Sequence, residues 1–509
     1  MRIREAIAAC LLALAPAAMA ADDGLSARIE ANLAKAGANR GQISAFLEGC
    51  ADSGDPQKLA AARFLVANMD GHGFARIALV AKDGREIPYE ALDHASLNDA
   101  KKALDAIETQ NPGADFARTR FDSDLEHASA AFLRAHLDEA FDAWRTYPWA
   151  KSISFEAFCN HILPYRGSNE PLGAWRAPAR ERLAALCAQN AGETDVRAVG
   201  EKVRATVHPW CGFSDIFYLH PTDQSYGEMC ERKLGRCEDI TNMVSFGMRS
   251  VATMCASDYT PWWAASDNNH AWEVVLDAAG NGRAGLAGRA AKVYRKTFAH
   301  QPDSLGAIKP DGVQVPRWLS GTHYIDVTAQ YQPVTDVTVA LDGLRDGERY
   351  AYLAVFNGGA WRPIHWGHVK DGRATFTAMG RSICYLPMTH RDGADVPAGP
   401  PFVVCQDGIA HTLAAKDAAS IALAATTTKP DIQDPDTGVV KVRTVVKPDA
   451  AFELFVWRDG WKSAGRIEKG RESHLFEGLS ADGLYWLVED GSERLERIFT
   501  VDGGKQVFW

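Results

Sequence analysis

The sequence has no excess of positive charge. Its 509 residues include 65 acidic and 55 basic side chains, so the formal net charge is −10 at pH 7. Proteins that bind DNA or RNA gather lysine and arginine on one surface, because contacts with phosphate supply much of their affinity. The composition therefore predicts no nucleic-acid partner.

Long apolar segments are also lacking. Arg2 and Arg4 precede one short apolar run, AIAACLLALAPAA, which is followed by an A-x-A motif at residues 18–20. The run is too short to span a bilayer, and its flanks are typical of a secretory signal peptide. We expect cleavage after Ala20, a periplasmic or secreted protein, and no membrane span. Lipidation at Ile7–Cys10 is the alternative, but cleavage there would fall inside the apolar run.

Metal-binding patterns are absent as well. The sequence has no CxxC pair and no cysteine–histidine spacing of the zinc-site type. HWGH, with His365 and His368, and DAAGNG at residues 277–282 come nearest to such patterns. Each offers too few ligands for zinc or calcium, so ordinary loop chemistry explains them better. We predict no metal and no cofactor.

The cysteine count is odd once the signal peptide is removed. Ten cysteines are present, and Cys10 would leave with the signal. In an oxidising compartment, nine remaining cysteines predict at least one free thiol. Cys211–Cys230 and Cys384–Cys405 are local candidates for disulfides, while burial of reduced thiols is the alternative.

The pattern of apolar residues predicts several domains, because 509 residues exceed a single core. Residues 21–200 repeat apolar side chains at helical spacing, with a turn expected at Ala81–Glu86. Residues 201–331 contain both helix-like and strand-like patterns. Within them, HAWEVVLDAAGNGRAG (residues 270–285) predicts a strand, an Asn-Gly turn and a second strand. In ILPYRGSNEP, Arg166 and Glu170 are expected to be structural ion partners.

The last third of the sequence is predicted to be all-β. Short strand-like runs separated by Gly and Asp turns indicate a sandwich-like module over residues 332–430. The stretch KPDIQDPDTG (Lys429–Gly438) is typical of a linker to a second β module over residues 438–509. The predicted fold class is therefore multidomain α+β: a helical N-terminal region, a mixed core and two all-β modules.

Tryptophans are concentrated in these β modules. Two interpretations exist: platforms for sugar stacking, or packing in the core and between domains. Alternating strands favour packing. The residues concerned are Trp361, Trp366, Trp457, Trp461 and Trp486.

Cys237 occupies an unusual position for a structural cysteine. It follows Gly235 and Arg236, and then small and apolar residues recur at helical spacing through Val251. The first turn of a helix favours negative charge, so a thiolate there would be reactive. The negative charges of Glu238 and the aspartate after it oppose this effect. Composition alone does not decide whether the pKa of the thiol is lowered or raised.

A cysteine nucleophile requires a base and a group that orients the base. His270 opens a strand-like run 33 residues later, and Asp326 ends another run 56 residues after that. Taken singly, such a histidine is more often structural and such an aspartate more often a turn residue.

Three motifs together resemble the transglutaminase-like superfamily. They are GRC at Gly235–Cys237, HAW at His270–Trp272 and DVT at Asp326–Thr328, in this order. The wider pattern, with PTDQS at Pro221–Ser225 and DYTPWWA at Asp258–Ala264, is similar to secreted bacterial members.

The resemblance implies a papain-like core and thiol acyl chemistry. Cys237 would be the nucleophile, His270 the base and Asp326 its orienter. The Cys237 backbone N–H would donate to the oxyanion, and Trp210, Gln224 and Tyr226 are unranked candidates for a second donor. The substrate would be an amide in a protein, peptide or glycopeptide, with hydrolysis favoured over amine transfer. A non-catalytic secreted protein that binds glycan or protein is the alternative function.

Overall fold

The structure is a computed structural model. It describes residues 24–286, 288–413, 418–423, 426–427, 432–433, 440–441, 446, 449–470, 475–480, 482–492 and 495–509. The predicted signal peptide and most of the predicted linker lie outside these residues. Within the described ranges, no helix has the length and apolar character needed to cross a membrane.

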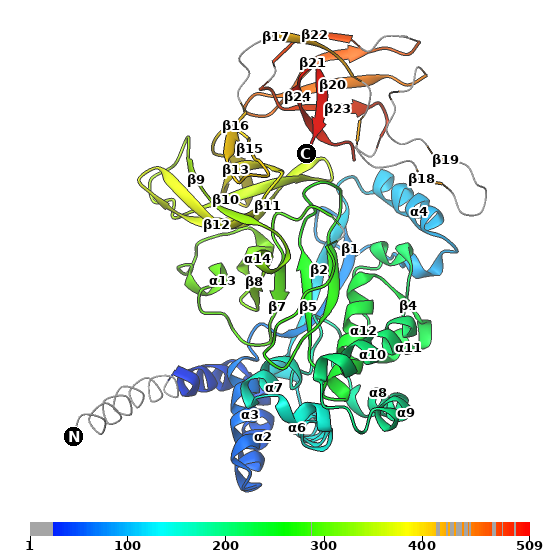
Figure 1. Ribbon diagram of the computed structural model, residues 1–509, viewed down its shortest axis with the longest axis vertical. Helices are drawn as coiled ribbons and strands as arrows, with labels where there is room; N and C mark the ends of the chain where they lie inside the picture. Colours follow the sequence, from blue (N-terminus) through cyan, green and yellow to red (C-terminus); the bar gives the residue numbers. More distant parts are fainter. Residues whose placement is uncertain are drawn as a thin grey trace. The chain divides into compact units, whose positions relative to one another are not determined.

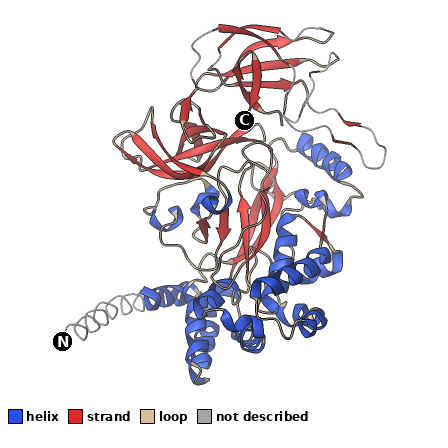
Figure 2. Ribbon diagram, viewed as in Figure 1, coloured by secondary structure: helices blue, strands red, loops and turns tan. Residues whose placement is uncertain are grey.

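The chain forms two compact units. The first consists of Met1–Asp258, Ala271–Ala284 and Lys296–Gln301, and the second of Tyr259–His270, Gly285–Arg295 and Pro302–Trp509. Helices predominate before residue 251 and strands predominate after residue 333 (Figure 2). The fold class is therefore multidomain α+β, as predicted.

Several helices of the first unit begin where a polar side chain caps their free N–H groups. Asp55 accepts hydrogen bonds from the N–H groups of Gln57 and Lys58, and Pro56 occupies the first helical position. The helices are α2 (Arg40–Asp52), α3 (Pro56–Ala67), α4 (Leu97–Gln110), α5 (Asp124–His127), α6 (Ala130–Thr146), α7 (Phe155–His161), α8 (Arg176–Arg182), α9 (Ala184–Gln189), α10 (Val196–Val207), α11 (Tyr226–Arg232) and α12 (Cys237–Ser250).

The region predicted to be helical also contains a two-stranded sheet. Strand β1 (Gly73–Val80) pairs antiparallel with β2 (Asp115–Ser123). The turn expected at Ala81–Glu86 does form, because Ala81 N–H donates to the Arg85 carbonyl at 2.8 Å. The bridge between Val80 and Glu86 and the hydrogen bond from the Ile87 N–H to the Leu79 carbonyl at 2.8 Å extend it into a short hairpin. The main partner of β1, however, begins 35 residues further along the chain. This pairing is long-range, so local pattern did not reveal it.

Helix α12 lies at the centre of the first unit's packing. It contacts α8, α10 and α11 (Figure 1), and nearly all of its residues are buried. Gly247 permits the close approach of α10, since a Cβ at this position would come within 2.6 Å of Val207 Cγ2. The indole of Trp149 donates to the carbonyl of Val251 at 2.9 Å, which fixes the end of the helix.

The HAW segment forms the strand that the sequence predicted. Strand β6 spans His270–Val275, and a turn follows in which Asp277 N–H donates to the Asn281 carbonyl at 2.9 Å. The second predicted strand is wrong: residues 282–286 form no strand. Gly282 and Gly285 weaken strand formation there. Short elements of this part of the chain are β3 (Gly212–Phe213), β4 (Leu234–Gly235), β5 (Cys255–Thr260), β7 (Tyr294–Lys296), α13 (Leu305–Ile308), β8 (Tyr324–Asp326) and α14 (Thr328–Tyr331).

The second unit contains an antiparallel sheet with strand order β16-β15-β13-β10-β11-β12-β9, and β14 also pairs with β13. Its core is apolar and includes Leu353, Ile364, Phe376 and Tyr385. The strands are β9 (Val334–Ala340), β10 (Tyr350–Asn357), β11 (Ala360–Lys370), β12 (Arg373–Gly380), β13 (Ile383–Arg391), β14 (Ala394–Pro397), β15 (Phe402–Val404) and β16 (Ala410–Thr412).

A second sheet of this unit has the order β21-β20-β23-β24-β25. Phe452, Leu454, Leu487 and Phe499 form part of its core. Its strands are β20 (Phe452–Trp457), β21 (Trp461–Ile467), β23 (Tyr485–Glu489), β24 (Ile498–Asp502) and β25 (Lys505–Phe508), and the remaining short strands are β17 (Ala418–Ala422), β18 (Ile432–Gln433), β19 (Val440–Lys441) and β22 (Leu475–Ser480).

The tryptophans of the two sheets pack together. Phe356 of β10 contacts Trp461 and Trp486, with ring centroids 5.7 and 5.1 Å apart, and Trp361 lies 5.7 Å from Trp457. Buried Arg497 donates to the carbonyl of Phe356 at 2.8 Å. These contacts support the packing interpretation of the tryptophans.

Candidate active site

Cys237 is the first residue of α12, as its position in the sequence predicted. The helix starts there because Asp239 accepts a hydrogen bond from the N–H of Arg236 at 3.0 Å and from the N–H of Gln224 at 3.1 Å. The Cys237 side chain is a partly exposed, free thiol. Its backbone N–H belongs to the first turn, where helices leave such groups without an intrahelical partner.

The expected lowering of the thiol pKa is not found. Burial raises the pKa of Cys237, and this effect exceeds the opposing hydrogen bond from the Ala271 backbone N–H. The charge of Glu238 raises the pKa further, whereas Arg236 and the Glu238 N–H lower it. The helix start alone therefore leaves a protonated thiol near pH 7, and chemistry at this sulfur requires a base.

Charged groups beside the thiol are paired with one another. The Arg236 guanidinium forms an ion pair with Asp223 and donates to the Pro221 carbonyl at 2.8 Å. Glu238 forms an ion pair with Lys296. Arg236 thus ties the start of α12 to the loop before α11, and Glu238 ties it to β7, which ends at Lys296.

His270 is the first residue of β6 and belongs to the second unit. Its ring lies 6.1 Å from that of Trp263, with an interplanar angle of 26°. The next residue, Ala271, belongs to the first unit and donates its N–H to the Cys237 thiol. The predicted base is therefore joined by one peptide bond to the residue that hydrogen-bonds the predicted nucleophile.

Asp326 ends β8, where both of its carboxylate oxygens have partners within the second unit. Oδ2 accepts a hydrogen bond from Lys292 Nζ at 2.6 Å, and Oδ1 accepts one from the Thr328 N–H at 2.9 Å. The fully buried Lys292 also donates to the carbonyls of Thr377 and Ala378 at 2.5 and 3.0 Å. Asp326 thus serves as the counter-ion of a buried lysine that the sequence did not reveal, and its convergence with His270 stays a prediction.

Of the candidates for a second oxyanion donor, Gln224 is engaged elsewhere. The Gln224 side chain donates to the Leu234 carbonyl at 3.0 Å and accepts from Arg232 at 3.0 Å. The Trp210 ring lies 3.5 Å from the Arg182 guanidinium, and the buried Tyr226 hydroxyl has no hydrogen-bond partner among the described residues. None of these contacts directs the three residues toward the thiol.

Tyr218 is a neighbour of the thiol that the sequence did not single out. Burial raises the pKa of Tyr218, and the negative charge of the Cys237 thiolate raises it further. The residue belongs to the short 3-10 helix Asp215–Leu219 and remains 40% exposed. An exposed aromatic residue shortly before the PTDQS motif was the only signal available.

Other residues singled out in the sequence are structural. Buried Arg166 pairs with Asp124, with Nε 2.6 Å from Oδ2, and Glu170 accepts the N–H groups of Gly167 and Ser168. This confirms the expected structural role, although the acidic partner of Arg166 is Asp124. His365 is buried, and its Nδ1 lies 3.0 Å from the Tyr294 hydroxyl.

The nine cysteines that the structure describes are all free thiols, so neither candidate disulfide forms. Burial raises the pKa of Cys211 and of Cys159 to about 12, which makes both thiols poor nucleophiles. Among the described residues, no cluster of three or more His, Cys, Asp or Glu side chains could hold a metal ion.

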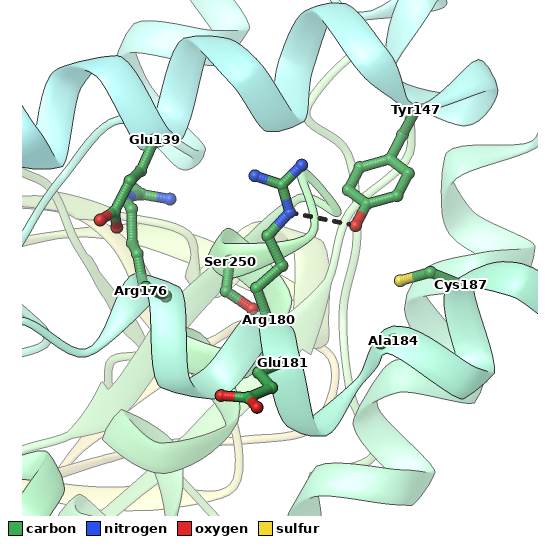
Figure 3. A pocket seen from close by; sticks show the side chains of 9 residues that line it. Glu139, Tyr147, Arg176, Arg180, Glu181, Ala184, Cys187 and Ser250 are labelled. Atoms are coloured by element: carbon green, nitrogen blue, oxygen red, sulfur yellow. Dashed lines mark hydrogen bonds between the residues drawn. The ribbon is translucent and has the colours of Figure 1, made fainter.

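A pocket of about 400 Å³ lies elsewhere in the first unit (Figure 3). Tyr147, Arg176, Arg180 and Cys187 are among its lining residues. Arg180 Nε donates to the Tyr147 hydroxyl at 3.2 Å, and Arg176 donates to the Arg249 carbonyl at 2.6 Å. Both arginines are thus already paired, and the pocket contains none of the residues predicted to be catalytic.

Comparisons with known proteins give little further information. No family model matches the sequence, and no curated protein matches it. Among solved structures, red sea bream transglutaminase is similar with a TM-score of 0.18 and 12% identity, over 63% of this chain and 70% of that chain. A likeness of this size carries no argument about fold or activity.

Proposed function

We propose that this protein is a cysteine enzyme of the transglutaminase-like type, in which Cys237 attacks an amide carbonyl and His270 acts as the base. The support from the sequence is the ordered set of GRC, HAW and DVT motifs. The single observation that carries the proposal is the hydrogen bond from the Ala271 N–H to the Cys237 thiol.

That hydrogen bond supports the pairing of nucleophile and base. Consecutive Cα atoms are about 3.8 Å apart across a trans peptide, so His270 begins within one residue of a group that touches the sulfur. The raised pKa of Cys237 fits the same scheme, because a protonated thiol becomes nucleophilic only when a base removes its proton.

The reaction then proceeds in two steps. His270 accepts the thiol proton as the sulfur attacks the carbonyl carbon, and the Cys237 N–H stabilises the resulting oxyanion. The imidazolium returns the proton to the leaving nitrogen, which departs as an amine and leaves a thioester. Water, deprotonated by His270, attacks the thioester, releases a carboxylic acid and restores the thiol.

Asp326 is proposed as the residue that orients His270, on the strength of the DVT motif alone. Its bonds to Lys292 and Thr328 would hold the carboxylate in place for this role. The same bonds also fit a purely structural aspartate, so the two roles need separate readouts.

Hydrolysis is the proposed outcome rather than amine transfer, because amine transfer requires a site that excludes water from the thioester. The proposed substrate is an amide in a protein, peptide or glycopeptide outside the cytoplasm. Export rests on the apolar N-terminal run and its A-x-A motif.

Thiol labelling tests the proposal without a known substrate. The protein is treated with chloroacetamide at pH 7, and the modified peptides are mapped by mass. We expect Cys237 to react first and the Cys237→Ala variant to lose that label. Cys405, another partly exposed free thiol, provides the matched control through Cys405→Ser. Uniform slow labelling of both thiols would contradict the proposal.

A further inference from the structure

A short segment of the first unit, residues 213–218, lies directly beside the strand that leads to Cys237. Strand β3 runs parallel to β4, with Phe213 opposite Gly235. The N–H of Ser214 donates to the Gly235 carbonyl at 2.9 Å. Because Gly235 is two residues before Cys237, whatever this segment binds is held close to the nucleophile.

Two aromatic rings of the segment are exposed. Phe213 is 54% exposed and Tyr218 40%, and their ring centroids lie 5.9 Å apart at an angle of 66°. Large aromatic side chains in contact with each other at a surface form a ready contact site for a ligand. Their faces carry partial negative charge, which attracts cations.

An exposed carboxylate lies between these two residues in the sequence. Asp215 forms no ion pair within the part of the chain that the structure describes. Its negative charge acts on Tyr218 together with that of Cys237, so the Tyr218 hydroxyl lies within electrostatic range of both groups. The neighbouring cation, Arg236, is already neutralised by its ion pair with Asp223.

A cavity opens on the same segment. It measures about 370 Å³ and is lined by Ser214–Ile216 and by Ala95–Asn98. Asn98 and Asp215 contribute side-chain oxygens to its lining, whereas the Ser96 hydroxyl is engaged with Asp99. Hydroxyl, amide and carboxylate oxygens accept hydrogen bonds from ammonium or guanidinium groups.

We propose that Phe213, Asp215 and Tyr218 form a subsite for a lysine or arginine side chain of the substrate, next to the amide that Cys237 attacks. The inference rests on the proposed function and names its substrate class. Aromatic faces, one unpaired carboxylate and oxygen acceptors together favour a cation over an apolar or acidic side chain. The formal net charge of −10 also draws cationic peptides toward the protein.

Matched inhibitors test this subsite. Three acetyl dipeptide chloromethyl ketones share glycine at the reactive end and differ in the preceding residue: arginine, norleucine or glutamate. In each, the Cys237 sulfur displaces chloride and forms a thioether, so the rate constant is read by intact mass. We expect the arginine compound to react roughly fivefold faster than the norleucine compound, and the glutamate compound to react slowest.

Single substitutions test which residues cause the preference for arginine over norleucine. Asp215→Asn should bring the ratio of arginine to norleucine rate constants close to one, and Phe213→Ser should lower it in part. Asp52→Asn removes one exposed carboxylate from the same unit and should keep the ratio, which controls for overall charge.

Each outcome is decisive. A faster norleucine compound, or a ratio that Asp215→Asn leaves unchanged, would overturn the subsite while Cys237 remains reactive. If chloroacetamide fails to label Cys237 in the unmodified protein, the proposed function itself is wrong and the subsite falls with it.

Discussion

The surroundings of Cys237 in the first unit and of Asp326 in the second differ in how completely they are satisfied. Asp326 has both oxygens occupied by Lys292 and Thr328, and the lysine has three acceptors for its three protons. Cys237 is partly exposed, carries a raised pKa, and receives hydrogen bonds from the backbone N–H groups of Ala271 and Glu238. A saturated network fixes a structure, whereas an incompletely satisfied group at an accessible helix start is available for chemistry. We therefore expect chemistry at Cys237 and a structural role for Asp326.

The strongest test of the reactive environment is His270→Gln. General base catalysis contributes about 100-fold or more, so chloroacetamide labelling of Cys237 at pH 7 should fall by about that factor. The loss should shrink as pH rises, because a growing fraction of the thiol then ionises without help. His368→Gln, an exposed histidine of the second unit, is the control and should not change the labelling rate. Equal labelling of both variants at pH 7 would remove His270 from the mechanism.

Asp326→Ala is the strongest test of the structural role of Asp326 as the counter-ion of Lys292. It leaves the ammonium of Lys292 buried without its counter-ion, and breaking buried pairs is costly. Because Lys292 keeps two carbonyl partners, we expect a loss of about 2 kcal/mol in the free energy of unfolding of the second unit, measured with denaturant. The double variant Lys292→Met/Asp326→Ala should recover part of the loss.

A second variant, Asp326→Asn, separates the two roles of Asp326. If it orients His270, Asp326→Asn should slow Cys237 labelling even where the protein stays folded. A loss of stability with unchanged labelling would mean that Asp326 acts only as the anchor of Lys292, and that His270 is oriented by another group.

Each unit also contains a buried histidine whose pKa lies well below its ordinary value. Burial is the main cause for both, with a further lowering by Arg176 at His136 and by Lys292 at His365. Since the unfolded chain protonates these rings near pH 6.5 and the folded chain does not, stability is lost as pH falls below that value. We expect each unit to lose about 1.4 kcal/mol per pH unit below pH 6.5 from its histidine.

Substituting each buried histidine in turn tests its effect on its own unit. His136→Asn should flatten the pH dependence of the first unit and His365→Asn that of the second, as followed by hydrogen exchange of each unit. A variant that flattens both dependences equally would show that the two titrations are coupled.

Local sequence pattern was sufficient where neighbouring residues decide the structure. The start of α12 at Cys237 and the strand at His270–Val275 follow from short-range pattern and agree with the structure. The pairing of β1 with β2, and of Lys292 with Asp326 across 34 residues, depends on contacts between distant segments. Single-sequence pattern contains no record of such contacts, so these features could not be predicted.

The pKa of Cys237 is another property that short-range sequence pattern could not predict. A helix start predicts a lowered pKa, but the burial that raises it is a property of the folded chain. Tyr218 was likewise overlooked, because its closeness to the thiol arises from the pairing of β3 with β4.

The smallest expected effect concerns Glu238, which raises the pKa of Cys237 through its charge. Glu238→Gln removes that charge, and this change favours the thiolate. The midpoint of the labelling rate against pH should move to lower pH, and the rate at pH 7 should rise roughly threefold. Glu231→Gln removes an exposed carboxylate from the adjacent helix α11 and should leave the midpoint in place. An equal rise in both variants would assign the effect to overall charge and not to the carboxylate beside the thiol.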